Sequence, residues 1–311
     1  MKILVTGGAG FIGSNVVDTY INEGHNVVII DNLSSGNINN INPKAKFYLL
    51  DIRSDVIEKV FDLERPDVVN HHAAQKSIPE SVEMPALDAD INIIGLINIL
   101  NNCVKYNVKK IIFISTGGAL YGNAKVVPTK ESCEPNMISP YAISKFASEK
   151  YLYFYHWLYG LKYTVLRLAN IYGPRQVPEG ECGVTPIFIN NLIIKIPSKL
   201  FASKDMPRGT TRDYIYVEDV CRANVLALVK GDNDIFNIGS GKETYTEDLY
   251  NILQKITNSY IPLIREMERP GDVKHSALDY SHAKEELGWE PRITLEEGLN
   301  KTYDFYKSFN C

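Results

Sequence analysis

Short apolar, β-branched runs alternate with longer amphipathic stretches over residues 1–170 of the chain. The apolar runs predict strands at residues Ile3–Thr6, Val27–Ile30, Phe47–Leu50, Val68–His71, Lys110–Ser115 and Tyr163–Arg167. The stretches between them predict helices, the longest at Ala86–Tyr106 and Ala142–Tyr159. This order of elements is typical of an α/β fold, a doubly wound parallel sheet with helices on both faces.

The regular alternation ends after Asn170, where proline and glycine interrupt the chain and the following elements become shorter. We therefore predict a first domain over residues 1–170 and a smaller C-terminal α/β lobe over residues 171–311. Two later strand-like runs, Arg212–Val217 and Ile235–Ile238, predict that the chain returns to the sheet once or twice between residues 212 and 240.

A glycine-rich turn follows the first predicted strand, with Gly7, Gly10 and Gly13 spaced as G-x-x-G-x-x-G ahead of an amphipathic run. Glycines allow a tight turn and a close approach of the backbone to a pyrophosphate, and the free N–H groups of a helix N-terminus attract its charge. We therefore predict a dinucleotide site to which these glycines, Phe11 and Ile12 contribute.

The second predicted strand leads into Asp31, 24 residues after Gly7. A carboxylate at this place accepts hydrogen bonds from the adenosine ribose and repels a 2'-phosphate, which favours NAD over NADP. In a purely structural interpretation, Asp31 only opens the turn that it forms with Asn32. The glycine turn favours the cofactor interpretation, and we assign both residues to the cofactor site.

Tyr141 and Lys145 have the spacing Tyr-x-x-x-Lys, which places both side chains on one face of a helix. The spacing alone means little, because it recurs at Tyr106/Lys110, Tyr121/Lys125, Tyr280/Lys284 and Tyr303/Lys307. The first pair differs in its place: Pro140 precedes it, a helical run follows it, and the preceding predicted strand ends in the hydroxyl side chains of Ser115 and Thr116. The carboxyl ends of parallel strands are where ligands bind in such sheets, so these groups are predicted to meet at the cofactor crevice.

A phenol with a pKa of about 10 is a poor base near neutral pH, but an adjacent ammonium favours the phenolate. Lys145 supplies that charge, and the Thr116 hydroxyl can hold a substrate oxygen in line. The three side chains are therefore our candidate catalytic group, with Tyr141 as the acid/base.

Charge and composition exclude several classes of protein. A net charge of -4 without a basic stripe argues against nucleic-acid binding, and no apolar run is long enough to span a membrane. The N-terminus begins directly with a strand-like run, so we expect a cytoplasmic protein. The five cysteines and six histidines lack metal-ligand spacing, and no metal is expected.

Together these motifs resemble the extended short-chain dehydrogenase/reductase superfamily (a Rossmann fold), and within it the UDP-glucose or UDP-N-acetylglucosamine 4-epimerases. The resemblance runs nearly from end to end. Its further motifs are Asp51-Ile52, His72-Ala73-Ala74, Lys76, Leu166-Arg167-Leu168-Ala169-Asn170, Arg212-Asp213-Tyr214 and Arg269-Pro270-Gly271-Asp272.

The resemblance implies a role for each motif. It places Asp51 and Ile52 at the adenine, Ala73, Ala74 and Lys76 beside the dinucleotide, Lys76 also near the substrate, Asn170 and Arg212 at the substrate diphosphate, and Arg269 and Asp272 at the uridine end. It also implies that Tyr141 removes the 4-hydroxyl proton of a UDP-hexose while carbon 4 is oxidised by NAD. The resulting 4-keto sugar turns over and is reduced on its other face, so there is no net redox change.

The stretch Ser115-Thr116-Gly117-Gly118 departs from the family, in which a non-glycine residue commonly follows the catalytic hydroxyl. Either Ser115 or Thr116 can therefore be the residue that corresponds to the catalytic hydroxyl, and we favour Thr116. The same stretch argues against the related 4,6-dehydratases and decarboxylases, which need an acidic residue there.

Ser276, seven residues past Arg269, stands where some similar epimerases have a bulky tyrosine that crowds the C2 substituent of the sugar. A small side chain is expected to admit an N-acetyl group. The resemblance therefore implies that UDP-GlcNAc and UDP-GalNAc are substrates as well as UDP-glucose and UDP-galactose.

Three classes of function remain open: the epimerase, a related sugar-nucleotide reductase or dehydratase, and a non-catalytic dinucleotide sensor. The aromatic stripe Tyr151, Tyr153, Phe154, Tyr155 and Trp157 is interpreted first as helix packing. With the helix over 86–106 it could also form the helix-pair interface of a homodimer, which the resemblance implies.

Overall fold

The computed structural model describes residues 1–178, 183–268 and 271–309. Its main sheet has seven strands, and every neighbouring pair is parallel. These strands are β1 (Lys2–Thr6), β2 (Asn26–Asp31), β3 (Lys46–Leu49), β4 (Val68–His71), β5 (Lys110–Thr116), β6 (Lys162–Leu168) and β11 (Asp234–Ile238). All the strands predicted for the first domain are present, each close to its expected bounds.

The strand order is β11-β6-β5-β4-β1-β2-β3. The chain thus builds outward from β1 to β3 and then starts again on the other side of β1 with β4. Such a reversal opens a crevice at the carboxyl ends of β1 and β4, where doubly wound folds bind their ligands. The crevice is the place where the glycine turn was predicted.

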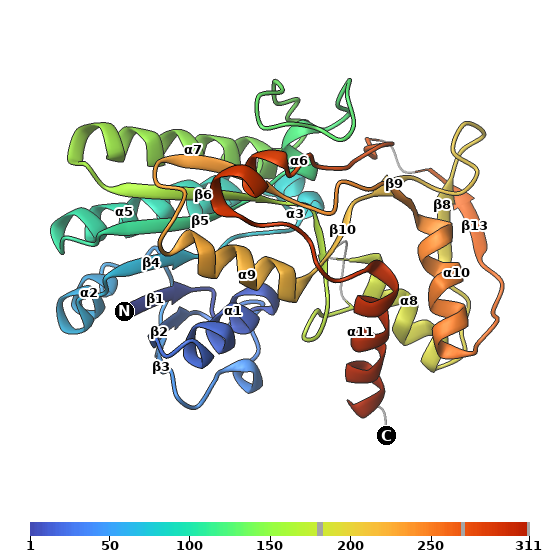
Figure 1. Ribbon diagram of the computed structural model, residues 1–311, viewed down its shortest axis with the longest axis horizontal. Coiled ribbons are helices and arrows are strands. Elements are labelled where there is room, and N and C mark those ends of the chain that lie inside the picture. The colour runs from blue at the N-terminus through green and yellow to red at the C-terminus, as the bar shows by residue number, and fades with distance from the viewer. Residues whose placement is uncertain (179–182, 269–270, 310–311) are drawn as a thin grey trace.

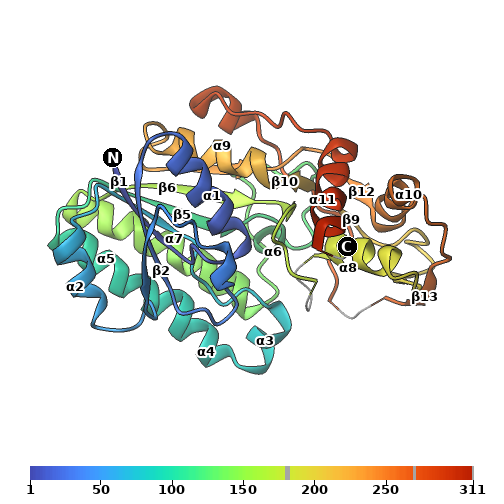
Figure 2. The same ribbon diagram turned by 90° about the horizontal axis from the view of Figure 1, so that it is seen from below.

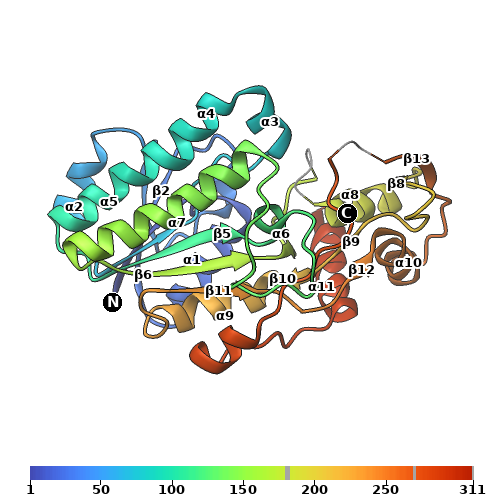
Figure 3. The same cartoon turned by 90° about the horizontal axis from the view of Figure 1, so that it is seen from above.

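Helices cover both faces of this sheet. The first-lobe helices are α1 (Phe11–Asn22), α2 (Ile57–Glu64), α3 (Ile78–Glu83), α4 (Pro85–Ala89), α5 (Gly95–Lys105), α6 (Gly118–Tyr121), α7 (Pro140–Tyr159) and α9 (Val217–Ala227), with short segments η1 (Ile38–Asn40) and η2 (Asp90–Ile94). Helices α2, α5 and α7 cover one face (Figure 3), and α1 and α9 lie together over the other (Figure 2). The doubly wound sheet is therefore confirmed.

Helix α7, which carries the candidate catalytic pair, has clear start and stop signals. The Ser139 hydroxyl accepts a hydrogen bond from the backbone N–H of Ala142 at 3.2 Å, and Pro140 occupies the first turn. The helix ends at Gly160, whose φ of +72° is left-handed. These signals fix where Tyr141 and Lys145 stand in the first two turns.

The long helix predicted over 86–106 is interrupted. Its residues form α4, the π-helical segment η2 and α5, which follow one another directly along the chain. A π-helical turn leaves a backbone carbonyl available, and the Ser148 hydroxyl of α7 donates to the carbonyl of Asn92 at 3.0 Å. The irregularity thus attaches this helix to α7.

Within the described residues the chain returns to the main sheet once, where the sequence predicted one or two returns. Residues 234–238 do extend the sheet as β11, beside β6. In contrast, β9 (Thr211–Arg212) pairs with β12 (Thr244–Tyr245), and β10 (Tyr214–Tyr216) pairs with β7 (Asn170–Tyr172). The apolar pattern of 212–217 predicted extended chain correctly, but a pattern does not say which strand is the partner.

The remaining elements form the lobe on the right of Figure 1. They are α8 (Val184–Ile193), β8 (Lys199–Ala202), α10 (Thr246–Thr257), β13 (Ile264–Met267) and α11 (Leu295–Phe309), whereas η3 (Ala283–Leu287) lies against α9 and β11. One continuous apolar cluster joins Val16 of α1 to Ile189, Leu253 and Leu299 of this lobe. No helix of the described residues combines the length and apolar composition needed to cross a bilayer.

Candidate active site

The glycine turn packs tightly against the chain that leaves β4. Gly7 has a φ of +69°, and a Cβ there would lie 2.6 Å from the backbone nitrogen of Ala73. A Cβ on Gly13 would overlap the carbonyl oxygen of Gly7. Both positions therefore require glycine for the turn to exist, before any ligand is considered.

We predict that Gly13→Ala disrupts this turn. The added methyl group has to displace Gly7, so cofactor affinity should fall by about a hundredfold or more, and the free energy of unfolding by about 1–3 kcal/mol. Titration with NAD and urea denaturation measure the two effects. Gly24→Ala is the control. Gly24 also has a positive φ, of +82°, but nothing lies within 4 Å of a Cβ added there. The control should lose stability and keep its NAD affinity, and equal affinity losses in both variants would contradict the prediction.

Asp31 stands at the end of β2 and is buried. One carboxylate oxygen accepts a hydrogen bond from the N–H of Ala9 at 2.9 Å, and the other accepts from the N–H of Leu33 at 2.8 Å. The residue therefore does hold its own turn, as the structural interpretation says. It also holds the glycine turn and lines the cavity described below, so the two interpretations are compatible.

Asn32 and Asp51, both assigned to the cofactor site in the sequence analysis, lie together. The Asn32 amide donates to the Asp51 carboxylate at 2.9 Å, and Arg53 forms an ion pair with the same carboxylate at 2.8 Å. The hydrogen bonds from Arg53 hold the pKa of Asp51 far below its usual range. Ile52 is buried beside them.

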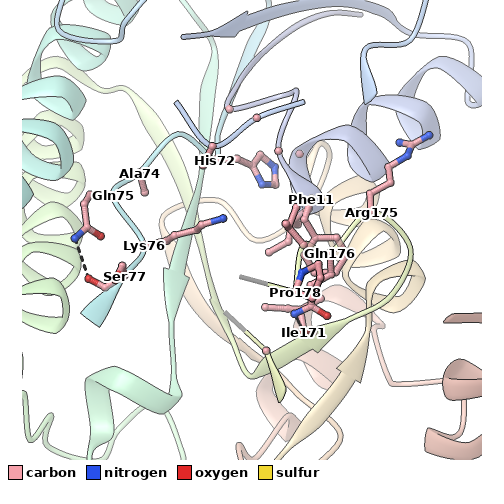
Figure 4. Close-up of a pocket in the computed structure, with 18 of the residues that line it drawn as sticks. Phe11, His72, Ala74, Gln75, Lys76, Ser77, Ile171, Arg175, Gln176 and Pro178 are labelled. Atoms are coloured by element: carbon pink, nitrogen blue, oxygen red, sulfur yellow. Dashed lines mark hydrogen bonds between the residues drawn. The ribbon is translucent and has the colours of Figure 1, made fainter. Parts of the chain in front are cut away.

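The loop after β4 carries His72, Ala73, Ala74 and Lys76 along the cavity. In Figure 4 the His72 ring and the Lys76 side chain both point into the space that faces Phe11. Burial and the Lys145 charge lower the pKa of His72 to about 3, so its ring is neutral. Among the described residues neither ring nitrogen of His72 has a hydrogen-bond partner, which leaves both for a ligand.

Lys145 is buried under the carboxyl end of β5. Its ammonium donates to the carbonyl of Ile114 at 2.9 Å and lies 6.0 Å from the centre of the Tyr141 ring. Burial lowers the pKa of Lys145 to about 8, against the opposing charges of Asp88 and Glu149. The lysine is therefore mostly charged at neutral pH and stands beside the phenol that it was predicted to activate.

The two candidate hydroxyls at the end of β5 have different surroundings. Thr116 lines the cavity together with Tyr141 and Lys145. The Ser115 hydroxyl instead donates to the buried carboxylate of Glu149 at 2.6 Å, on the α7 side of the strand. The alternation of side chains along a strand explains the difference.

The opposite wall of the cavity comes from the second lobe and includes Asn170, Arg212 and Asp272. The Arg212 guanidinium donates to the carbonyls of Thr211 and Val273, at 2.7 and 2.6 Å, so it also fixes the segment that carries Asp272. Arg269 lies outside the described residues.

Ser276 is buried and does not line the cavity. Its hydroxyl oxygen lies 3.5 Å from the place that a Cβ on Gly118 would take. Apart from Ser276, every site residue predicted from the sequence and described by the structure lines this one cavity, whose volume is about 1730 Å³.

Sequence reasoning missed part of the cavity wall. These residues come from α8, β8, α10, α11 and the chain before α8, and include Gln176, Phe188, Asn191, Lys199, Phe201, Thr246, Phe305 and Tyr306. They are spread over most of the C-terminal lobe without a shared spacing, so no local signal in the sequence connects them. Their mixed aromatic and amide character fits a polar ring system such as a nucleobase.

Within residues 1–178, 183–268 and 271–309, no three His, Cys, Asp or Glu side chains gather in a way that could hold a metal ion. The cavity offers acid/base groups, a cation and backbone N–H groups instead. Such a set suits proton transfer beside a bound dinucleotide.

A doubly wound sheet with a glycine turn at its switch point and a Tyr-x-x-x-Lys pair in the crevice defines the short-chain dehydrogenase class of dinucleotide-dependent proteins. Within that class, the chain belongs to the NAD dependent epimerase/dehydratase family, whose model matches residues 3–239.

Relatives that match over nearly the whole of both chains are similar to this protein at a more specific level than the family. The chain is 44% identical to a putative UDP-glucose 4-epimerase of Methanocaldococcus jannaschii, over 99% of both chains. It is 50% identical to the UDP-glucose 4-epimerase of Thermotoga maritima, whose structure with UDP-glucose covers 100% of both chains with a TM-score of 0.97. A UDP-N-acetylglucosamine 4-epimerase of Methanobrevibacter ruminantium, in complex with UDP-N-acetylmuramic acid, is 34% identical with a TM-score of 0.93 and covers 99% of this chain and 98% of that one.

Proposed function

We propose that this protein inverts carbon 4 of UDP-hexoses in an NAD-dependent reaction that passes through a 4-keto sugar. One observation carries the proposal: Thr116, Tyr141 and Lys145 line the same cavity as the glycine turn on one side and Arg212 and Asp272 on the other. The proposal is supported by the similarity of this chain to proteins that are described as UDP-glucose 4-epimerases.

The residues present fit NAD. The turn at Gly7 and Gly13 has no room for side chains and leads into the N-terminus of α1, whose first N–H groups have no partner within the helix, and Asp31 is set for a ribose. The unpartnered nitrogens of His72 face the same space. When bound, NAD supplies the redox chemistry by taking a hydride from carbon 4 of the sugar and returning it.

The chain's own groups handle the proton. Tyr141 as phenolate accepts the proton of the 4-hydroxyl as carbon 4 is oxidised, and returns it when the 4-keto sugar is reduced. The Lys145 ammonium stabilises the phenolate, and the Thr116 hydroxyl donates a hydrogen bond to the sugar oxygen. Asn170, Arg212 and Asp272 bind the UDP end, so that the sugar can turn while its anchor stays in place.

Four UDP-sugars test the proposal directly: UDP-glucose, UDP-galactose, UDP-GlcNAc and UDP-GalNAc. Each is incubated with purified protein, and the products are separated by chromatography. We expect conversion to the 4-epimer with no change of absorbance at 340 nm. Stoichiometric consumption of reduced cofactor would instead identify a reductase, and loss of water from the sugar would identify a dehydratase.

Ser276 sets the expected range of sugars. If it lies beside the C2 substituent, Ser276→Tyr should lower kcat/KM for the acetylated pair by about tenfold or more and leave the plain hexoses within about threefold. Ser276→Ala is the matched control and should keep both activities, because it adds no bulk. Unchanged turnover of the acetylated pair in the tyrosine variant would place the C2 pocket elsewhere.

We also propose that the protein is a homodimer through α5 and α7. The predicted aromatic stripe divides in two: Tyr155 is buried and donates to Asn101 at 2.6 Å, whereas Tyr153, Phe154 and Trp157 are 59%, 44% and 70% exposed. Exposed aromatic side chains on a helix pair are typical of an interface between copies.

Sedimentation measures this assembly. The wild type is expected at twice the chain mass of 35.0 kDa, and Trp157→Asp at the single mass. Leu63→Asp is the control, since Leu63 is a similarly exposed apolar residue on α2. A wild type that sediments as a monomer rejects the interface.

A further inference from the structure

A buried ion pair lies directly behind the candidate catalytic group. Glu149 follows Lys145 by one turn and Tyr141 by two turns of α7, on the same face. Its carboxylate is 2% exposed and accepts hydrogen bonds from both strands beneath it. Ser115 of β5 donates at 2.6 Å, and Arg167 of β6 donates through Nε at 3.0 Å and Nη2 at 2.6 Å.

Arg167 extends this contact to the chain that follows Thr116. Its other terminal nitrogen donates to the Tyr121 hydroxyl at 2.7 Å and approaches the carbonyl of Glu131 at 3.4 Å. Thr116 therefore stands between two clamped points, Ser115 before it and Tyr121 after it. The backbone that carries Thr116 therefore cannot shift without breaking buried, charge-assisted hydrogen bonds on one side or the other.

The same carboxylate is part of the electrostatic surroundings of Lys145. The charged and titratable groups that face this lysine are Glu149 and Tyr141 on α7, Asp88 on α4, and His71 and His72 at the end of β4. Burial lowers the pKa of both histidines to about 3, so they carry no charge at neutral pH. Burial raises the pKa of Asp88. Asp88 and Glu149 are the two carboxylates whose charge favours the ammonium form of Lys145, Asp88 the more strongly, and Glu149 is the one that forms an ion pair with Arg167.

We propose that Glu149 is a positioning residue of the catalytic group: through Ser115 it fixes where Thr116 stands, and its charge adds to that of Asp88 in favouring the ammonium form of Lys145. This inference rests on the proposed epimerase function and deepens it. Glu149 was assigned no role from the sequence.

The pH dependence of kcat in the NAD-loaded enzyme is the decisive measurement. If the Lys145 ammonium stabilises the phenolate, kcat falls as the pH rises through the pKa of Lys145, which is about 8. A neighbouring anion favours the ammonium, so Glu149→Gln lowers the pKa of Lys145. The fall of kcat at high pH, which is the alkaline limb of the pH profile, then moves to lower pH by about half a unit or more. Arg167→Gln leaves the carboxylate without its cation and moves the limb to higher pH.

Ser115→Ala separates the two parts of the role. It removes one hydrogen bond and keeps the charge, so the alkaline limb should stay while kcat falls about tenfold and KM changes less than twofold. If Glu149 only stabilised the fold, its substitution would leave the alkaline limb of the kcat profile at its wild-type pH. The proposal is overturned if folded, NAD-loaded Glu149→Gln keeps the wild-type limb within about 0.2 pH units.

Two further experiments cover a Glu149 variant that does not fold and measure the titration of Lys145 without turnover. If Glu149→Gln does not fold, the double variant Glu149→Gln/Arg167→Gln removes both charges and is expected to show a smaller shift in the same direction. A carbon-13 NMR titration of the lysine Cε signals, with Lys145 assigned by Lys145→Met, reads the lysine without turnover. A wild type that converts no UDP-sugar overturns the proposed function, whereas an unchanged Lys145 titration in the Glu149 variant overturns this inference.

Discussion

Replacing Tyr141 with phenylalanine is expected to lower kcat for UDP-hexose epimerisation by about 10²- to 10⁴-fold. The variant loses a single oxygen, the one that takes the proton from the sugar, and keeps the ring that lines the cavity. Bound NAD and the free energy of unfolding should stay close to the wild type. Product separation after incubation with UDP-glucose gives the rate, and release of the nucleotide by denaturation gives the NAD content.

Tyr153→Phe on the same helix is the matched control. Tyr153 is 59% exposed, on the side of α7 away from the cavity, so its variant should keep the wild-type kcat. The mechanism is rejected if Tyr141→Phe, with its NAD content intact, retains kcat within about threefold of the wild type. In that case another group near carbon 4 would have to move the proton.

Two kinds of signal made the first lobe predictable from sequence. Short apolar runs between helical stretches produce a parallel sheet, and short-range motifs such as the Gly7–Gly13 turn depend on one strand and the helix after it. The Tyr141 and Lys145 pair was separated from four other pairs with the same spacing by its position at the start of a helical run, after Pro140 and a strand that ends in hydroxyl groups. The structure places it in the cavity.

What the sequence could not supply is pairing over long distances. The pattern of 212–217 predicts extended chain equally well for the main sheet and for the small pairings with β7 and β12, because both partner strands lie far from it along the chain. The buried contact between Glu149 and Arg167 joins a helix to a strand. Glu149 lies in no motif, and Arg167 lies in one whose predicted role belongs to Asn170 alone. The register between Ser115 and Thr116 also depended on geometry, since both are hydroxyl residues at the end of one strand.

Replacing Asp213 with alanine is expected to lower the free energy of unfolding by about 3–5 kcal/mol, because the substitution breaks a buried hydrogen-bond network. The carboxylate is fully buried and accepts four hydrogen bonds: from the N–H and the hydroxyl of Ser240 at 2.8 and 2.6 Å, from the N–H of Gly241 at 3.1 Å and from the N–H of Leu278 at 3.0 Å. Alanine leaves three buried backbone donors without their acceptor, and each costs about 1–3 kcal/mol, only partly additive. Urea denaturation followed by circular dichroism measures the loss.

The same substitution should weaken substrate binding, because of what Asp213 joins. It lies next to Arg212, and its hydrogen bonds tie that strand to the chain just after Ser276. With the tie removed, Arg212 and Asp272 lose their fixed separation, so KM for UDP-sugars should rise while NAD affinity, which depends on the other wall of the cavity, stays unchanged. Asp205→Ala is the control, since that side chain is 84% exposed and its removal should change stability by no more than about 0.5 kcal/mol. Equal stabilities of the two variants would mean that the buried donors find other acceptors, and that Asp213 does not hold the substrate wall in place.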